Sequence, residues 1–184
     1  MAGLFSAIIV VLQLISTFVK FGPVNITLAL APIIIGAALY GRRFSAFLGT
    51  VLGVVVAISG AFGWDGGFVL SLATYHPVII YLVAIFKTTI AGYLAGIVYE
   101  LIAKKNSLIA VITSGIVCPI VNTGLFVAAM VVFFNSALLD MAGGTQVMKF
   151  IIFGLTGTNF VIELAVNMLL AASITRVVKV LKKY

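Results

Sequence analysis

Residues 77–106 read PVIIYLVAIFKTTIAGYLAGIVYELIAKKN. The stretch begins with Pro77, which suits the first turn of a helix, and is mostly apolar up to Ala103. A membrane-crossing helix needs about 20 predominantly apolar residues, and this run is longer than that. One cation, Lys87, lies inside the apolar run that ends at Ala103. The stretch therefore predicts a membrane-spanning helix that carries a buried charge.

The composition places the whole chain in a bilayer. Of its 184 residues, 64% are hydrophobic and 8% are charged, whereas soluble domains have about 45–50% and about 25%. This excludes a soluble enzyme, a disordered tail and a nucleic-acid binder. The apolar residues suffice for about six membrane helices. We expect an all-α integral membrane protein with six transmembrane helices, forming a single membrane domain over residues 1–184.

Six spans can be drawn from the hydropathy pattern. In chain order they cover about residues 2–19, 27–40, 44–62, 77–103, 108–134 and 147–180. The first run lacks a basic leader and a small-residue cleavage site, so we interpret it as a helix that stays in the protein. Polar segments at 63–76 and 135–146 are expected to be connections.

The net charge of +7 marks one side of the membrane. Most basic residues lie in the second-to-third turn, the fourth-to-fifth turn and the C-terminal segment. They are Arg42, Arg43, Lys104, Lys105, Arg176, Lys179, Lys182 and Lys183. Six spans bring these segments to one side, which the positive-inside rule makes cytoplasmic. Both termini are then cytoplasmic. The basic residues are expected to contact anionic headgroups of the lipid bilayer, and we expect no nucleic-acid partner.

Placing an ionisable residue inside a membrane span costs free energy, so such residues are candidates for a functional role. Lys87 lies roughly 15 Å below the outer end of its helix, at 1.5 Å per residue. Asn159, Glu163 and Asn167 share one face of the last span, and Asn122 lies in the fifth. These groups either hold the helices together, with Lys87 neutralising Glu163, or line a pocket for a small polar molecule. Lys87 would then face an anionic group of the substrate.

Polar and aromatic residues also gather on the outer connections, at Asn25, Trp64, Tyr75 and His76. Trp and Tyr are common interfacial anchors in membrane proteins. Alternatively, they stack on a ligand when the loops close. His76 precedes Pro77, which favours a position outside the helix. With one His and one Cys, the sequence predicts no transition-metal site.

Small residues recur at four-residue spacing, which lets membrane helices approach closely. The pairs are Gly49 with Gly53, Gly92 with Gly96, Gly3 with Ala7, and Ala2 with Ser6. Internal packing explains such pairs in general. The pairs in the first span could instead dock another membrane protein.

Several short motifs follow one another along the first third of the chain, and their order and spacing can be compared with those of known families. Residues 23–27 read PVNIT, residues 32–37 read PIIIGA, and residues 41–53 read GRRFSAFLGTVLG. Further matches are Gly92 with Gly96, Asn122 to Gly124, and Asn159 with Glu163. In their order and spacing, these motifs resemble the substrate-binding S component of an energy-coupling factor (ECF) vitamin transporter.

This resemblance implies a six-helix bundle that captures a water-soluble vitamin from outside, in a bacterial plasma membrane. Such a protein is not an enzyme and binds no cofactor itself. It docks on a transmembrane coupling protein and two cytosolic ATPase subunits, which use ATP and Mg. The docking face of the first helix would fall on Ala2, Gly3, Ser6 and Ala7. The first outer loop, about residues 20–26, would gate the pocket.

Several ligands and mechanisms remain open at this point. Lys87 suits a carboxylate, which favours pantothenate or folate, and the few aromatics in the spans disfavour a large flat ring. Pantothenate is therefore the favoured substrate, with hydroxymethylpyrimidine as the alternative. A different class is a stand-alone ion-coupled carrier that uses Lys87 and Glu163 as a proton relay. A third is a membrane scaffold whose polar groups only join helices.

Overall fold

The computed structural model describes residues 1–18, 29–143, 146–151 and 157–181. Within these residues, the regular structure is helical. The helices are α1 (Ala2–Phe18), α2 (Leu30–Tyr40), α3 (Arg42–Ala61), α4 (Phe68–Ala73), α5 (Pro77–Ala103), α6 (Ser107–Phe133), α7 (Asn135–Ala142), α8 (Val147–Lys149) and α9 (Gly157–Leu181).

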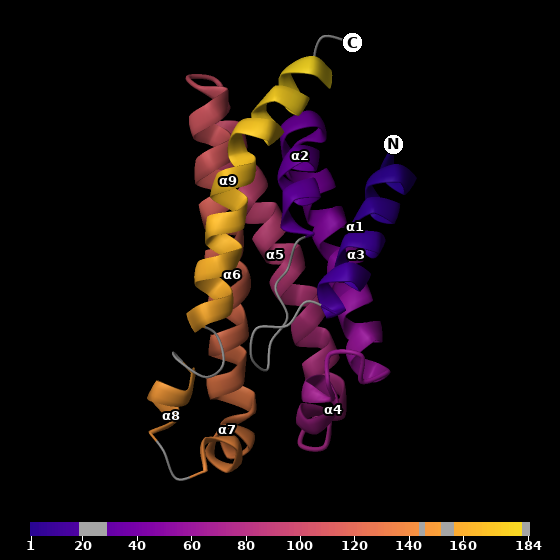
Figure 1. Ribbon diagram of the computed structural model, residues 1–184, viewed down its shortest axis with the longest axis vertical. Coiled ribbons are helices and arrows are strands. Elements are labelled where there is room, and N and C mark those ends of the chain that lie inside the picture. Colours follow the sequence, from indigo (N-terminus) through magenta and orange to yellow (C-terminus); the bar gives the residue numbers. More distant parts are fainter. Residues whose placement is uncertain (19–28, 144–145, 152–156, 182–184) are drawn as a thin grey trace.

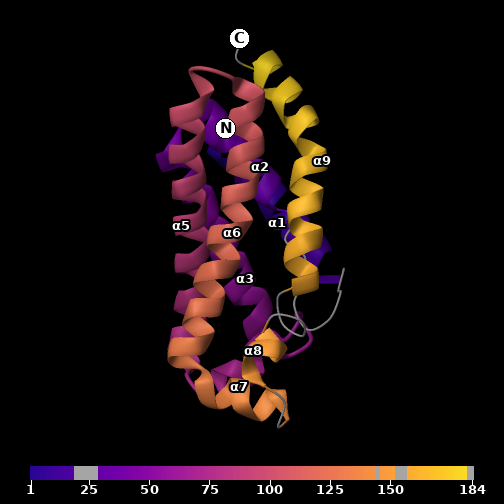
Figure 2. The same cartoon turned by 90° about the vertical axis from the view of Figure 1, so that its left-hand side faces the viewer.

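The longer helices α1, α2, α3, α5, α6 and α9 run up and down the long axis of an elongated bundle (Figures 1 and 2). The α2–α3 and α5–α6 turns lie at the end where α1 begins and α9 finishes (Figure 1). We call this the basic end, because Arg42, Arg43, Lys104 and Lys105 occupy its two turns. The short helices α4, α7 and α8 lie at the opposite end, which we call the distal end (Figure 1).

Three helices of the described residues are long and apolar enough to cross a membrane, namely α3, α5 and α6. Helix α1 is a shorter apolar helix, and α2 has 11 residues. At 1.5 Å per residue, α2 is roughly 16 Å long, about half of a hydrocarbon core of about 30 Å. The expected count of six spans and the cytoplasmic position of both termini therefore stay predictions.

The ends of α5 and α6 follow from local chemistry. Pro77 occupies the first turn of α5, where its missing N–H has no intrahelical acceptor to lose. Asn106 then caps α6, and its Oδ1 accepts hydrogen bonds from the N–H groups of Leu108 at 2.9 Å and Ile109 at 3.1 Å. Because α5 ends at Ala103 and the Asn106 cap starts α6 at Ser107, the structure confirms the tight turn expected between these two long helices.

The polar connections contain helices that the sequence did not predict. Residues 63–76 were expected to form a loop, but α4 lies within them. The carboxylate of Asp65 accepts hydrogen bonds from the N–H groups of Gly67 at 3.0 Å and Val69 at 2.8 Å, which starts this helix. Residues 135–146 likewise contain α7. The predicted sixth span was wrong at its start, because 147–149 form the separate helix α8 and α9 begins at Gly157.

Small residues join α3 to α5, which make the most extensive helix pair among the described residues. A Cβ added to Gly53 would lie 2.5 Å from the Cα of Ile85, and one on Gly92 would lie 2.5 Å from the carbonyl oxygen of Ser45. The Ser45 hydroxyl donates to the Gly92 carbonyl at 2.8 Å. The internal-packing interpretation is therefore confirmed for these glycines.

Three apolar clusters fill the bundle from end to end. One joins α1, α2, α3 and α5 with Cys118 of α6, and includes Ile9 and Leu48. A second lies at the basic end among α2, α5, α6 and α9, around Tyr99. The third, around Phe134, holds α4, α7 and α8 against α5 and α6 at the distal end. The bundle therefore presents rigid helix faces between which polar side chains can be positioned.

Candidate functional site

Lys87 lies half-buried on α5 with its ammonium over an aromatic ring. The Nζ atom is 4.7 Å from the ring centroid of Phe126, a buried residue of α6. An ammonium at this distance is attracted by the negative face of the ring. The contact points the charge of Lys87 toward the interface between α5 and α6.

Glu163 brings a buried carboxyl group to the same region from α9. Its side chain is 5% exposed, and its carboxylate is near enough to Lys87 to attract the ammonium group. Among the described residues, the one ion pair at contact distance is Arg42 with Glu100, so Lys87 and Glu163 attract each other across a gap. The Oε1 atom of Glu163 is buried and has no hydrogen-bond partner in the described part of the chain.

Helix α6 adds a polar column to this region. Ser114, Cys118, Asn122 and Phe126 follow one another at four-residue spacing on its buried face, so they share one side of the helix. The Oδ1 atom of Asn122 and the hydroxyl of Ser114 are also buried without a hydrogen-bond partner among the described residues. The column connects the level of Lys87 with the part of α6 nearer the basic end.

Buried acceptors without a hydrogen-bond partner, close to a cation, are candidates for binding a ligand. Leaving a buried polar atom without a hydrogen bond costs about 1–3 kcal/mol, so each such atom in a native structure requires an explanation, for example a functional role or a bound ion or water molecule. Asn122 Oδ1 and Glu163 Oε1 can accept hydrogen bonds from a ligand, while Lys87 can donate to one. We name Lys87, Asn122, Phe126 and Glu163 the polar cluster.

Two further buried polar groups were missed by the sequence reasoning. The Oε1 atom of Gln13 on α1 and the hydroxyl of Ser59 on α3 are both buried and unpaired within the described residues. Gln13 lies on the same face of α1 as Phe5 and Ile9. A lone glutamine in an otherwise apolar run was the signal that could have identified it.

Tyr75 and His76 lie at the distal end, where they join the α4–α5 connection to α7. The hydroxyl of Tyr75 donates a hydrogen bond of 2.5 Å to Asp140. This hydrogen bond to a carboxylate raises the pKa of Tyr75 above its ordinary value of 10.0. The ring of His76 meets that of Phe134 edge to face, with centroids 5.6 Å apart.

Trp64 lies exposed just beyond α3, stacked on Phe62 with ring centroids 5.5 Å apart. Lys87 is ten positions along α5 from Pro77, roughly 15 Å at 1.5 Å per residue. The structure thus brings Lys87, Asn122 and Glu163 together and places Trp64, Tyr75 and His76 in a separate distal group.

Two predicted site residues fall outside what the structure describes. Asn25 lies outside the described residues. Asn159 belongs to α9, but its side chain is outside the described part. The described residues contain no group of three or more His, Cys, Asp or Glu side chains that could hold a metal ion.

The four small residues of α1 lie on its outer side. Ala2, Gly3 and Ala7 are exposed, and Ser6 is half-buried. Nothing lies within 4 Å of a Cβ added to Gly3, unlike the glycines between α3 and α5. The face of α1 that carries Ala2, Gly3 and Ala7 is therefore not used for packing within the described bundle, whereas Phe5 on the opposite face is buried.

Comparison with protein families decides what the chain is. The model of the family described as "ECF transporter, substrate-specific component" matches residues 1–175. The chain belongs to this family. As an S component, it is a substrate-binding subunit of a membrane transporter and not an ATPase, and it associates with other components of that transporter. Searches of curated proteins and of solved structures found no match for this S component.

Proposed function

We propose that this S component captures a water-soluble vitamin or vitamin precursor from outside a bacterial plasma membrane at the polar cluster, and that its best substrate is pantothenate. The observation that carries the proposal is the pair of buried acceptors Asn122 Oδ1 and Glu163 Oε1, which have no hydrogen-bond partner among the described residues and lie close to the cation Lys87. A ligand that pairs with all three groups removes the cost of leaving them unpaired.

The chemistry of pantothenate suits these three groups. Its carboxylate can pair with the ammonium of Lys87, and its hydroxyl and amide N–H groups can donate hydrogen bonds to Asn122 and Glu163. Folate also carries carboxylates but has a large flat ring system. Hydroxymethylpyrimidine offers an amine and a hydroxyl as donors but has no carboxylate, so Lys87 would find only uncharged acceptors.

The energy for uptake would come from partner subunits. We propose that a transmembrane coupling protein docks on Ala2, Gly3, Ser6 and Ala7, and that two cytosolic ATPases bound to it use ATP and Mg. The unfilled space around Gly3 supports this docking face, since small residues let a second helix approach closely. The chain itself then needs no cofactor.

The substrate can be identified by mass spectrometry of small molecules that co-purify with the detergent-solubilised protein. Equilibrium binding of pantothenate, folate and hydroxymethylpyrimidine then ranks the three ligands. We expect pantothenate to bind most tightly and to compete with the co-purified molecule. Tighter binding of hydroxymethylpyrimidine would contradict a carboxylate partner for Lys87.

Partner docking can be tested with Gly3→Leu, which places a bulky side chain on the exposed face of α1. Co-purification with a co-expressed coupling module should be lost, while ligand binding by the isolated subunit is unchanged. Leu4→Ala is the control, since it removes bulk from a neighbouring exposed position. Retained co-purification of Gly3→Leu would place the docking face elsewhere.

The alternative of a stand-alone ion-coupled carrier makes a different prediction. Liposomes that contain only this chain would then accumulate substrate when a proton gradient is imposed, and Glu163→Gln would abolish the accumulation. A capture subunit should bind substrate but show no such flux without its ATPases.

A further inference from the structure

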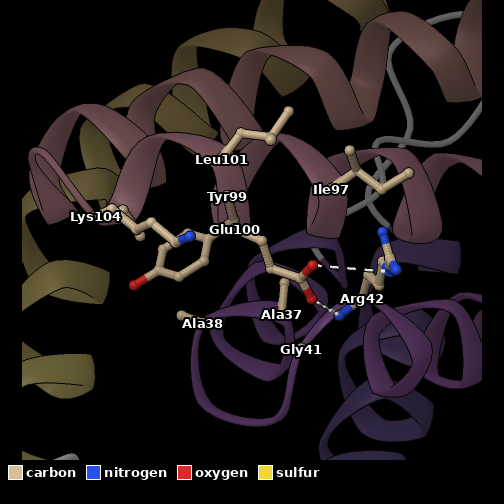
Figure 3. A pocket seen from close by; sticks show the side chains of 10 residues that line it. Ala37, Ala38, Gly41, Arg42, Ile97, Tyr99, Glu100, Leu101 and Lys104 are labelled. Carbon is tan, nitrogen blue, oxygen red and sulfur yellow. Dashed lines mark hydrogen bonds and ion pairs between the residues drawn. The ribbon is translucent and has the colours of Figure 1, made fainter.

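A concave site lies at the basic end of the bundle, away from the polar cluster. It is a pocket of about 490 Å³ between the end of α2, the start of α3 and the end of α5. Figure 3 shows Arg42 and Lys104 on either side of Glu100 in this pocket, with Ile97 and Leu101 from the same helix as Glu100. The substrate proposal assigns no role to this pocket.

The acidic residue of the pocket is already engaged. The Oε1 atom of Glu100 accepts a hydrogen bond from the backbone N–H of Arg42 at 2.8 Å, and its Oε2 lies 3.8 Å from Arg42 Nε. Glu100 therefore caps the N-terminus of α3, where a negative charge is favourable. Gly41 makes this approach possible, because it has φ 83° and its added Cβ would lie 3.0 Å from Glu100 Oε1.

Lys104 leaves the pocket with a net positive charge. Its side chain is exposed, and no carboxylate of the described residues lies within ion-pair distance of it. Arg43 and Lys105 are exposed nearby on the same two turns. Arg42 is further held over the ring of Tyr93, 5.9 Å from its centroid. The positive charge thus stands in a concave site whose geometry is fixed by neighbouring helices.

Apolar residues also line the pocket, and they could contact the acyl chain of a lipid. Leu101 is 71% exposed, and Ile97 lies one turn earlier on the same face of α5. The buried residues Ala37 and Ala38 form part of the lining. The site lies where α3 begins and α5 ends, and the ends of membrane-spanning helices are where lipid headgroups are expected.

We propose that this pocket binds the phosphate headgroup of an anionic phospholipid, with Lys104 and Arg42 as its cations and Ile97 and Leu101 against its acyl chain. Basic pockets between helices at the membrane boundary favour such headgroups. An exposed leucine beside the cations favours a ligand with an apolar tail over a soluble phosphate compound.

Native mass spectrometry of the intact detergent-solubilised chain tests the proposal. Phosphatidylglycerol and phosphatidylcholine with the same acyl chains are added separately, since they differ in net charge. We expect phosphatidylglycerol to be retained preferentially. Lys104→Gln should weaken its binding about fivefold, as expected for one basic residue near an anionic lipid, and Lys104→Arg should retain it.

Lys105→Gln is the matched control, because Lys105 is the adjacent exposed lysine and does not line the pocket. It should weaken binding less than twofold. Glu100→Gln keeps a hydrogen-bond acceptor for the N–H of Arg42 but removes a negative charge, so it should tighten binding. Equal losses in Lys104→Gln and Lys105→Gln would overturn the pocket in favour of general attraction to the basic end.

The source of the phosphate is distinguished with soluble glycerol 3-phosphate. It should bind far more weakly than phosphatidylglycerol, because it lacks the acyl chains that contact Ile97 and Leu101. Equal binding of the two would overturn a lipid ligand and indicate a soluble phosphate compound. Equal retention of phosphatidylglycerol and phosphatidylcholine would overturn recognition of the anionic headgroup.

Discussion

Gly49 of α3 lies directly against the backbone carbonyl of Thr88 on α5, with no space between them for a side chain. Thr88 is the residue after Lys87, so this contact sets the depth and rotation of the helix that carries the cation. The packing of two small-residue faces therefore positions the candidate site.

Gly49→Ala should destabilise the protein by about 1–3 kcal/mol, the usual cost of overpacking. The reason is that the added methyl group would collide with the Thr88 carbonyl, which belongs to a helix backbone and cannot rotate away. Thermal unfolding in detergent measures the change. Gly3→Ala is the control, since open space surrounds Gly3, and equal stability of both variants would contradict the packing.

Lys87→Met should weaken ligand capture by about 1.5–3 kcal/mol, the usual value of a hydrogen bond to a charged group. Methionine is similar in length to lysine and can still pack against Phe126. Equilibrium binding with the co-purified ligand measures the effect. Unchanged affinity would remove Lys87 from the substrate site.

Asn122→Leu should change stability and binding in opposite directions. Removing a buried acceptor that has no partner among the described residues should raise the free energy of unfolding of the ligand-free protein by about 1 kcal/mol, and losing one hydrogen bond should weaken ligand binding by about 0.5–1.5 kcal/mol. Thermal unfolding and equilibrium binding are measured on the same preparation. A fall in both would mean that Asn122 holds the helices together.

The hydrogen bond from Tyr75 to Asp140 predicts a pH dependence at the distal end. The pKa of Tyr75 is raised, so the folded state holds this proton more tightly than the unfolded state. The contribution to stability is complete below pH 10 and is lost as the pH rises through the raised value. Tyrosinate formation can be followed by an absorbance titration at alkaline pH. In Tyr75→Phe, the part of the curve that rises at the higher pH should be lost.

Asp140→Asn is the companion variant for this titration. Without the carboxylate, Tyr75 should ionise closer to its ordinary value of 10.0. An unchanged titration curve in Asp140→Asn would show that the two groups do not interact in solution.

The sequence predicted α5 and α6 almost to the residue because their ends are marked by Pro77 and by Asn106. It missed α4 and α7, since helices of 6 and 8 residues are too short to show a hydrophobic period. It also joined α8 to α9, because the apolar residues of the intervening stretch continue the hydropathy of the span. Short helices depend on packing and caps, such as Asp65, that hydropathy does not report.

Lys87, Asn122 and Glu163 could be selected from the sequence because polar groups stand out in apolar spans. Their relative arrangement could not, since it depends on the rotation of α5, α6 and α9 about their axes. The sequence allowed an ion pair between Lys87 and Glu163, and the structure places the two groups near enough to attract each other but not in direct contact. The Arg42–Glu100 pocket was not anticipated, because residues 58 positions apart meet only once the helices are packed.

The stacking of Trp64 on Phe62 gives the distal end its own optical reporter. Trp64 is the only tryptophan of the chain and is 49% exposed, so the indole emission of the whole protein originates at the α3–α4 connection. Any event that changes the solvent exposure of Trp64 or the structure of the α3–α4 connection will shift the emission maximum without an engineered label. Events confined to the basic end will leave the emission maximum unchanged, so one intrinsic fluorophore separates what happens at the two ends of the molecule.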